Sequence, residues 1–203
     1  MTNQETLKIG IIGAARVAVY AMLAPAVANP NTEVVGIAAR DPARAKEFAS
    51  THGIAKAYAT YDALIGDPGI DLVYVATPPM LHKAVAIKAL RAGKHVLVEK
   101  PFAADAREAA EIIAAVKHGK RVFEAFHYRH HALWNRIVEL VRGGELGSIK
   151  HIEAAFHVPI PKSPEEFRWS ASLGGGALMD LGCYPLQWTR VVAGEEPRVH
   201  CSG

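Results

Sequence analysis

A lysine at the end of a short apolar run is the residue of this chain best placed to do chemistry. Lys100 stands in the run Val96-Leu97-Val98-Glu99-Lys100-Pro101. The apolar part of the run is typical of a parallel strand that is buried on both faces. Pro101 cannot continue a hydrogen-bond ladder, so the chain leaves the sheet there. Lys100 is therefore expected at the carboxyl edge of a sheet, where open α/β folds bind their ligands.

A second pattern combines glycines with an acid and a phenol. The run Gly174-Gly175-Gly176 precedes a predicted helix that carries Asp180 and Tyr184. Residues four apart lie on one face of a helix. A phenol beside a carboxylate can exchange a proton with an alcohol, and a nearby lysine lowers the tyrosine pKa from ~10. The alternative is structural: Lys100 is a solvated charge, Tyr184 only packs and Asp180 caps a glycine turn.

The turn after the first predicted strand approximates a nucleotide-binding fingerprint. The segment from Gly13 to Ala18 is close to G-x-G-x-x-G/A, in which a helix N-terminus binds a pyrophosphate. Gly13 supplies the tight turn and Ala18 allows close packing. Ala15 replaces the middle glycine, so the pyrophosphate lies farther away or the turn shifts. The predicted contacts with the cofactor are Gly13, Ala14, Ala15, Arg16 and Val17.

Arg40 indicates which nicotinamide cofactor is bound. It stands at the tip of the second predicted strand, and Asp41 follows it as the cap of the next helix. An acidic residue at this tip binds the ribose 2′-hydroxyl of NAD, whereas arginine accommodates the 2′-phosphate of NADP. The sequence predicts NADP, with NAD as the alternative cofactor. The alternative is that Arg40 has no role in cofactor binding and is a solvated arginine beside the capping Asp41.

Strand and helix patterns alternate through the first 125 residues. This alternation predicts an α/β fold, a doubly wound parallel sheet with right-handed crossovers, as a domain over residues 1–125. The predicted strands are 7–12, 34–39, 55–58, 71–76, 96–98 and 121–125, and the predicted helices 16–28, 42 onward, 61–65, 81–92 and 105–117.

Residues 126–203 are expected to form part of a second domain. A helix is predicted over 133–142, a strand with one solvent-exposed face over 148–158, and the start of another strand over 197–202. Because a sheet of two strands is marginal, this domain is expected to be incomplete and the sequence a fragment of a longer chain.

Composition excludes several classes of protein. The chain has 203 residues, 50% of them hydrophobic and 21% charged, as in ordinary globular proteins. A net charge of +3 without a dense basic cluster argues against nucleic acid. The two cysteines, Cys183 and Cys201, are too few for a disulfide framework. The sequence shows neither a signal peptide nor an apolar stretch of the ~20 residues that a membrane span needs. We therefore expect a cytoplasmic protein without a membrane partner. The histidine-rich segment 126–131 lacks the partners that zinc prefers, and no metal site is predicted.

Five motifs, in this order, resemble those of the glucose–fructose oxidoreductase / inositol dehydrogenase / rhizopine-catabolism (Gfo/Idh/MocA) family of nicotinamide-dependent oxidoreductases: GIIGAARVA, AARDPARAKEFA, YVATPPMLH, AGKHVLVEKPF and GGGALMDLGCYP. The resemblance covers nearly the whole chain. It implies a Rossmann domain followed by an α+β domain with an open, mainly antiparallel sheet that often serves subunit association. Members of the family are longer than this chain.

The resemblance also implies roles for single residues. Lys100 would be catalytic, Asp180 and Tyr184 would lie in the substrate pocket, and Glu99 at the nicotinamide end. Three further residues would lie beside the cofactor: Thr77, Pro78 and His82. Tyr184, where many inositol dehydrogenase-like members have histidine, resembles the dihydrodiol and xylose dehydrogenase branch, whose members tend to use NADP(H).

The sequence thus predicts an NADP(H)-dependent oxidoreductase that transfers hydride between the nicotinamide and a CH–OH group of a sugar, polyol or trans-dihydrodiol. Tyr184 is the predicted proton acceptor, and Lys100 holds the substrate oxygen. Acid–base assistance of this kind is worth ~10²–10⁴ in rate. A complete chain is expected to be a homo-oligomer, most simply a dimer. Two alternatives stay open: a non-catalytic NAD(P)-binding sensor of the same fold, and an inactive truncated product.

Overall fold

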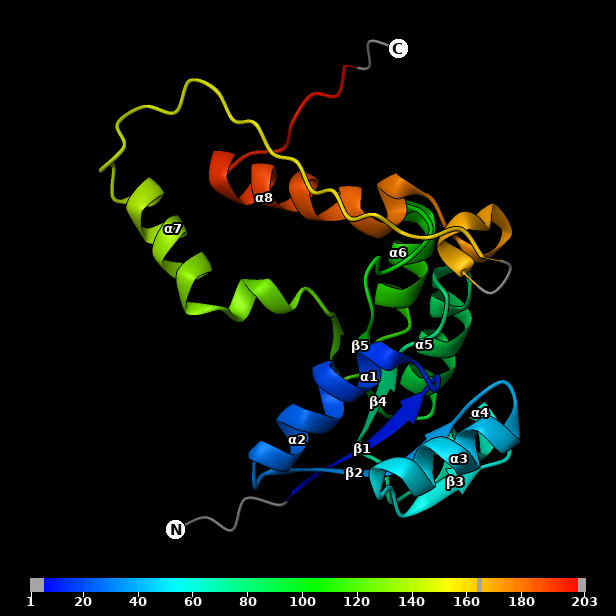
Figure 1. Cartoon of the computed structure of the whole chain (residues 1–203). Helices are drawn as coiled ribbons and strands as arrows, with labels where there is room; N and C mark the ends of the chain where they lie inside the picture. The colour runs from blue at the N-terminus through cyan, green and yellow to red at the C-terminus, as the bar shows by residue number, and fades with distance from the viewer. Residues whose placement is uncertain (1–5, 164–165, 201–203) are drawn as a thin grey trace, which may run out of the picture. The chain divides into compact units, whose positions relative to one another are not determined.

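Six short strands form one parallel sheet in the N-terminal part of the chain (Figure 1). The computed structural model describes residues 6–163 and 166–200. The strands are β1 (Leu7–Ile12), β2 (Thr32–Ala38), β3 (Lys56–Tyr58), β4 (Leu72–Val75), β5 (His95–Val98) and β6 (Val122–Glu124). Their order in the sheet is β3-β2-β1-β4-β5-β6 and every adjacent pair is parallel. This is the strand order of dinucleotide-binding folds, so the predicted doubly wound α/β fold is confirmed.

Helices connect the strands and cover both faces of the sheet. They are α1 (Arg16–Ala18), η1 (Val19–Leu23), α2 (Ala24–Ala28), α3 (Pro42–His52), α4 (Tyr61–Gly66), η2 (Pro79–Leu81), α5 (His82–Arg91) and α6 (Ala106–Ala114). Side chains alternate along a strand between the two faces. In β4, Val73 and Val75 enter one apolar cluster with α4, α5 and α6, whereas Tyr74 enters another with η1 and α3. The sheet is therefore buried on both sides, as its apolar strands predict.

The helix predicted over 16–28 is present but contains a wide turn. The Ala24 amide donates to the Val19 carbonyl, five residues back, so that Val19–Leu23 forms a π-helical turn. Pro25 follows directly and has no amide hydrogen to donate. The wide turn thus lies where a regular α-helix would lose a hydrogen bond in any case. The predicted cap of the next helix is confirmed, because the Asp41 carboxylate accepts a hydrogen bond from the Ala43 amide at 2.9 Å.

The described residues fall into two compact units. The first contains the sheet, up to Ala125, together with Ser172–Gly174, and the second contains the remaining described residues. Residue 125 stays the proposed boundary between the domains.

The second unit is built from helices and loops. Its elements are η3 (His127–His130), α7 (Ala132–Arg142), η4 (Phe167–Trp169), η6 (Leu178–Gly182) and α8 (Cys183–Ala193), and the short turn η5 (Ala171–Leu173) adjoins it. The strand predicted over 148–158 is wrong, because these residues form no strand. A strand needs a neighbour for its amides and carbonyls, and the described part of this unit contains no strand to supply one.

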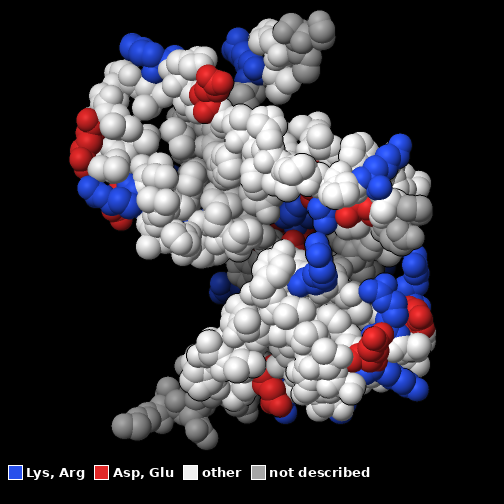
Figure 2. Space-filling view, viewed as in Figure 1, with Lys and Arg blue, Asp and Glu red and all other residues white. Residues whose placement is uncertain are grey.

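The second strand and the antiparallel sheet that were predicted for this part of the chain are not found in its described residues. Residues 197–200 of the second predicted strand are not a strand, whereas 201–202, like Cys201, lie outside the described residues. The expected antiparallel sheet is absent from the described part of the unit. None of the described helices is long and apolar enough to cross a membrane. Acidic and basic side chains are interspersed on the face of the molecule seen in Figure 2.

Candidate active site

The register of the parallel strands aligns the carboxyl ends of the six strands, and Tyr58 at the end of β3 pairs with Ala38. Ala38 pairs with Ile12, Ile12 with Val75, Val75 with Val98 and Val98 with Glu124. The residues that follow each of these strands therefore leave the sheet at the same edge. This row brings the turn after β1, the segment after β4 and the segment after β5 next to one another.

Gly13 makes the turn after β1, and the site tolerates no side chain there. Its φ is +113°, and its amide donates to the Ala38 carbonyl at 2.8 Å. A Cβ added to Gly13 would lie 2.3 Å from the carbonyl oxygen of Ala76. The backbone after β1 thus passes in direct contact with the backbone after β4, as the fingerprint glycine requires.

The helix that follows Gly13 begins without a side-chain cap. Ala15 is its N-cap residue, and neither a side-chain hydrogen bond nor an acidic residue serves the first turn. The first amides of the helix are therefore available to an anion, which the helix dipole favours. Ala14, Ala15 and Val17 pack against the apolar cluster of this face of the sheet. Ala15 accordingly contributes its methyl group to packing. Arg16 is exposed on the first turn.

Thr77, directly after β4, carries a buried hydroxyl with no hydrogen-bond partner among the described residues. An unmade hydrogen bond of a buried group costs about 1–3 kcal/mol. A polar group of a bound ligand would supply the missing partner. Together with the Gly13 turn and the uncapped helix, this hydroxyl fits a dinucleotide at the edge of the sheet. Pro78 follows Thr77 and is partly buried.

Glu99 is held by a tyrosine that the sequence analysis missed. The Tyr74 side chain is 1% exposed, and its hydroxyl donates to a Glu99 carboxylate oxygen at 2.6 Å. Burial raises the pKa of Tyr74 far above its usual range, and the Glu99 charge raises it further. The phenol therefore stays a donor at every ordinary pH. An aromatic residue within the buried run before Thr77 is the only signal in the sequence for this contact.

Further hydrogen bonds hold the segment 99–102, which contains the partly buried Lys100. The Glu99 amide donates to the Val75 carbonyl at 2.9 Å. At the other end, the Phe102 amide donates to the Glu124 carboxylate at 2.8 Å. Glu124 was not predicted as a site residue, because its link to Phe102 joins the end of β6 to the loop after β5, 22 residues apart in the sequence. The backbone around Lys100 is thus fixed from both sides.

Two arginines lie around the tip of β2. Arg40 is exposed there. Burial raises the pKa of Tyr61, and the nearby Arg40 charge lowers that pKa by a smaller amount. Arg44, on the first turn of α3, donates to the Ala14 carbonyl at 3.4 Å. This contact brings the Arg44 guanidinium to the turn that follows β1. The sequence analysis named Arg40 alone, because the approach of Arg44 depends on how α3 packs beside the turn.

In the second unit, Tyr184 lies among aromatic rings and is 8% exposed. Its ring centroid is 5.3 Å from that of Phe126 and 5.3 Å from that of Phe156, with the ring planes nearly perpendicular. Tyr128 and Trp188 lie 5.9 Å and 6.2 Å away. Edge-to-face contacts of this kind are favourable, and they fix the orientation of the Tyr184 ring.

Asp180 lies in the π-helical turn η6, where a regular α-helix was predicted. Its carboxylate is 4.0 Å from Nε of Arg168, which also pairs with Glu166 at 3.1 Å. The glycine run allows this approach: a Cβ on Gly175 would lie 2.5 Å from the Phe167 carbonyl oxygen. Asp180 and Tyr184 belong to the second unit and Lys100 to the first. Joint action of the three on one substrate is therefore a proposal.

No group of three or more potential metal ligands occurs among the described residues. In the histidine-rich segment, Nδ1 of His131 accepts a hydrogen bond from the Leu133 amide at 3.1 Å and so caps α7.

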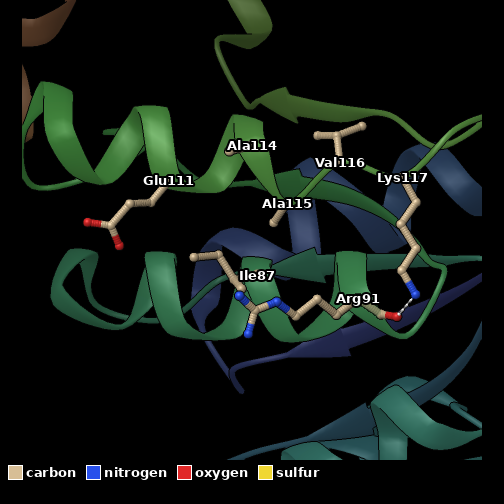
Figure 3. A pocket seen from close by; sticks show the side chains of 7 residues that line it. All are labelled: Ile87, Arg91, Glu111, Ala114, Ala115, Val116 and Lys117. Carbon is tan, nitrogen blue, oxygen red and sulfur yellow. Dashed lines mark hydrogen bonds between the residues drawn. The ribbon is translucent and has the colours of Figure 1, made fainter.

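A hollow of about 490 Å³ lies between α5 and α6, away from the aligned strand ends (Figure 3). It is lined by Ile87, Arg91, Glu111, Ala114, Ala115, Val116 and Lys117.

Comparison with known proteins agrees with this geometry. A model of an oxidoreductase family with an NAD-binding Rossmann fold, Gfo/Idh/MocA, matches residues 7–127, and a model of the C-terminal domain of that family matches 134–203. A dTDP-3,4-didehydro-2,6-dideoxy-α-D-glucose 3-reductase of Streptomyces violaceoruber is 39% identical over 96% of the chain and 57% of its own length. An NADP⁺-dependent D-xylose 1-dehydrogenase of Haloferax volcanii is 37% identical over 97% of the chain and 60% of its own length.

A solved structure is similar as well. The 3-ketoreductase KijD10 of Actinomadura kijaniata, in complex with NADP and TDP-benzene, superposes with a TM-score of 0.86 and 36% identity. The superposition covers 93% of this chain and 58% of that one. The chain thus spans less than two thirds of the length of these relatives.

The contact between Tyr74 and Glu99 can be tested by stability. Tyr74→Phe removes only the hydroxyl, and hydrogen bonds to charged groups contribute about 1.5–3 kcal/mol, so the free energy of unfolding in urea should fall by about that amount. Tyr20→Phe, on an exposed residue, is the control and should change little. In a double-mutant cycle, Glu99→Gln should add less to Tyr74→Phe than it costs alone. Strict additivity would mean that the two side chains do not interact.

Proposed function

Because the chain belongs to the Gfo/Idh/MocA family of oxidoreductases, we propose that the whole protein is an NADP(H)-dependent oxidoreductase acting on a CH–OH group of a sugar-like substrate. The observation that carries the proposal is the aligned row of strand ends, which places the Gly13 turn and the Lys100 segment at one edge of the sheet. Sugars, polyols and trans-dihydrodiols are the substrate classes that we consider. A homodimeric, cytoplasmic protein remains a prediction, which light scattering and localisation of the full-length protein would test.

The first unit supplies the groups that would hold the cofactor. The Gly13 turn and the uncapped helix start suit the pyrophosphate, and the Thr77 hydroxyl suits a polar group of the ligand. Arg40 and Arg44 suit a 2′-phosphate, because a guanidinium binds phosphate through paired, charge-assisted hydrogen bonds. When bound, the nicotinamide supplies or accepts the hydride.

The chain's own residues would handle the substrate and its proton. We assign to the Lys100 ammonium the task of holding the substrate oxygen, and its backbone is fixed in advance by the bonds at both ends of segment 99–102. Tyr184 would exchange the proton of the substrate hydroxyl, and its ring is held by its aromatic neighbours. Asp180 would orient the substrate. Groups held in position before the reaction lower its barrier, because less freedom is lost in the transition state.

The cofactor assignment predicts a preference for NADPH over NADH in a fluorescence titration. Arg40→Asp should abolish or reverse this preference. Arg44→Ala should weaken NADPH binding by about tenfold or more, since a charge-assisted hydrogen bond contributes about 1.5–3 kcal/mol, and should leave NADH binding nearly unchanged. Arg107→Ala, which removes an exposed guanidinium from α6, is the matched control. Equal affinity of the wild type for NADH and NADPH would refute the role given to the arginines.

The catalytic assignment predicts a loss of turnover with little loss of NADPH binding. Lys100→Met removes the charge, and Tyr184→Phe removes only the phenolic oxygen. Each should slow NADPH-coupled turnover in a panel of aldoses, ketosugars and dihydrodiols, the tyrosine variant by ~10²–10⁴. The double variant should lose less than the product of the two effects, because groups that act as a unit are not additive. A Tyr184→Phe enzyme within threefold of wild type, with chemistry limiting the rate, would remove Tyr184 from the mechanism.

A further inference from the structure

Both ring nitrogens of His82 lie against backbone carbonyl oxygens. Nδ1 is 2.8 Å from the oxygen of Pro101, and Nε2 is 2.8 Å from the oxygen of Thr77. The residue, the first of α5, is 0% exposed. The sequence analysis expected His82 beside the cofactor, yet its two nitrogens are already engaged by the protein backbone. Any contribution of His82 to the site therefore passes through the groups that it holds.

The chemistry of the ring limits how many of these contacts exist at once. A carbonyl oxygen only accepts hydrogen bonds, so each facing nitrogen must carry a hydrogen. A neutral imidazole has one N–H group, whereas an imidazolium has two. The neutral ring thus makes one hydrogen bond and sets a lone pair against the other oxygen. Only the protonated ring satisfies both carbonyls at 2.8 Å.

The two carbonyls belong to segments that form the candidate active site. Thr77 follows β4, and Pro101 directly follows Lys100. We propose that His82 is a positioning residue: it holds the backbone of Lys100 through the Pro101 carbonyl, and uptake of a proton by the ring completes a second tether to Thr77. The consequence for catalysis rests on the proposed function of Lys100, whereas the tether itself does not.

The surroundings of the ring set the direction of its titration. Burial lowers the pKa of His82 below its usual value, the two carbonyl contacts raise it, and the Lys100 cation lowers it. On α5, the neighbouring Lys83 is paired with Glu108 at 3.1 Å and Glu111 at 3.4 Å, both of α6. The lowered pKa means that the ring is neutral, with one tether, at pH values above it. The second tether forms as the pH falls through the pKa of His82.

Two substitutions separate the two sides of the ring. An asparagine amide can place its donor near the position of Nδ1, and a glutamine amide near that of Nε2. His82→Asn should therefore keep the bond to Pro101 and lose the bond to Thr77, whereas His82→Gln should do the reverse. His95→Asn is the matched control, because His95 lies at the amino end of β5, at the opposite edge of the sheet.

Amide hydrogen exchange of peptides that cover residues 99–104 measures the Pro101 tether without any substrate. Wild type, His82→Asn and His95→Asn should exchange alike, and His82→Gln should exchange about tenfold faster, as expected for one lost hydrogen bond. The pH profile of kcat should contain a step in the wild type that both His82 variants lack. Wild-type exchange rates in His82→Gln would overturn the tether to Pro101.

The nitrogen resonances of the histidine ring test the proton directly. In ¹⁵N spectra of the wild type, His82 should change from one N–H group to two as the pH falls below the usual histidine pKa, because burial lowers the pKa of this ring. A ring that keeps a single N–H down to the pH at which the protein unfolds would overturn the second tether, and this result does not depend on whether a variant folds. If both tethers are found but Lys100→Met retains full turnover, the catalytic role proposed for Lys100 fails and the tether stands.

Discussion

Direct contact between the backbones that follow β1 and β4 is the constraint on which the candidate site depends. A Cβ on Gly13 would lie 2.3 Å from the Ala76 oxygen, so only glycine fits at this position of the turn. The same contact brings the start of the helix at Arg16 to the edge of the sheet where β4 and β5 end. Without it, the uncapped start of the helix and the Lys100 segment would not share one edge. The site thus follows from the register of three parallel strands and one residue without a side chain.

Buried polar groups at this edge serve to fix the backbone. Tyr74 holds Glu99, Glu124 holds the amide of Phe102, and His82 lies against two carbonyls. Tyr74 and His82 would be costly to bury alone, and the polar atoms of both lie against partners in the loops that follow β4 and β5. The Thr77 hydroxyl differs, because the described residues offer it no hydrogen bond. The edge therefore combines a rigid frame with one polar position that a ligand can complete.

The periodicity of the sequence predicted the first unit well. All six strands lie within two residues of their predicted bounds, since a buried parallel strand is an apolar run that ends at a turn residue. Asp41 was identified as a cap because its effect is local. The residues missed, Tyr74, Glu124 and Arg44, act through contacts between elements distant in the sequence. Spacing along the chain does not reveal such contacts. Alternation over 148–158 likewise could not predict a strand, because a strand depends on a partner that the alternation does not specify.

Amide hydrogen exchange with and without NADPH tests most directly whether the aligned strand ends form the cofactor site. Peptides that cover residues 13–18, 76–78 and 99–102 should become protected when NADPH is added, because their backbone lines the row of strand ends. Peptides that cover 87–91 and 111–117, which line the hollow between α5 and α6, should not change. Protection confined to that hollow, or none at the Gly13 turn, would contradict this account of the site.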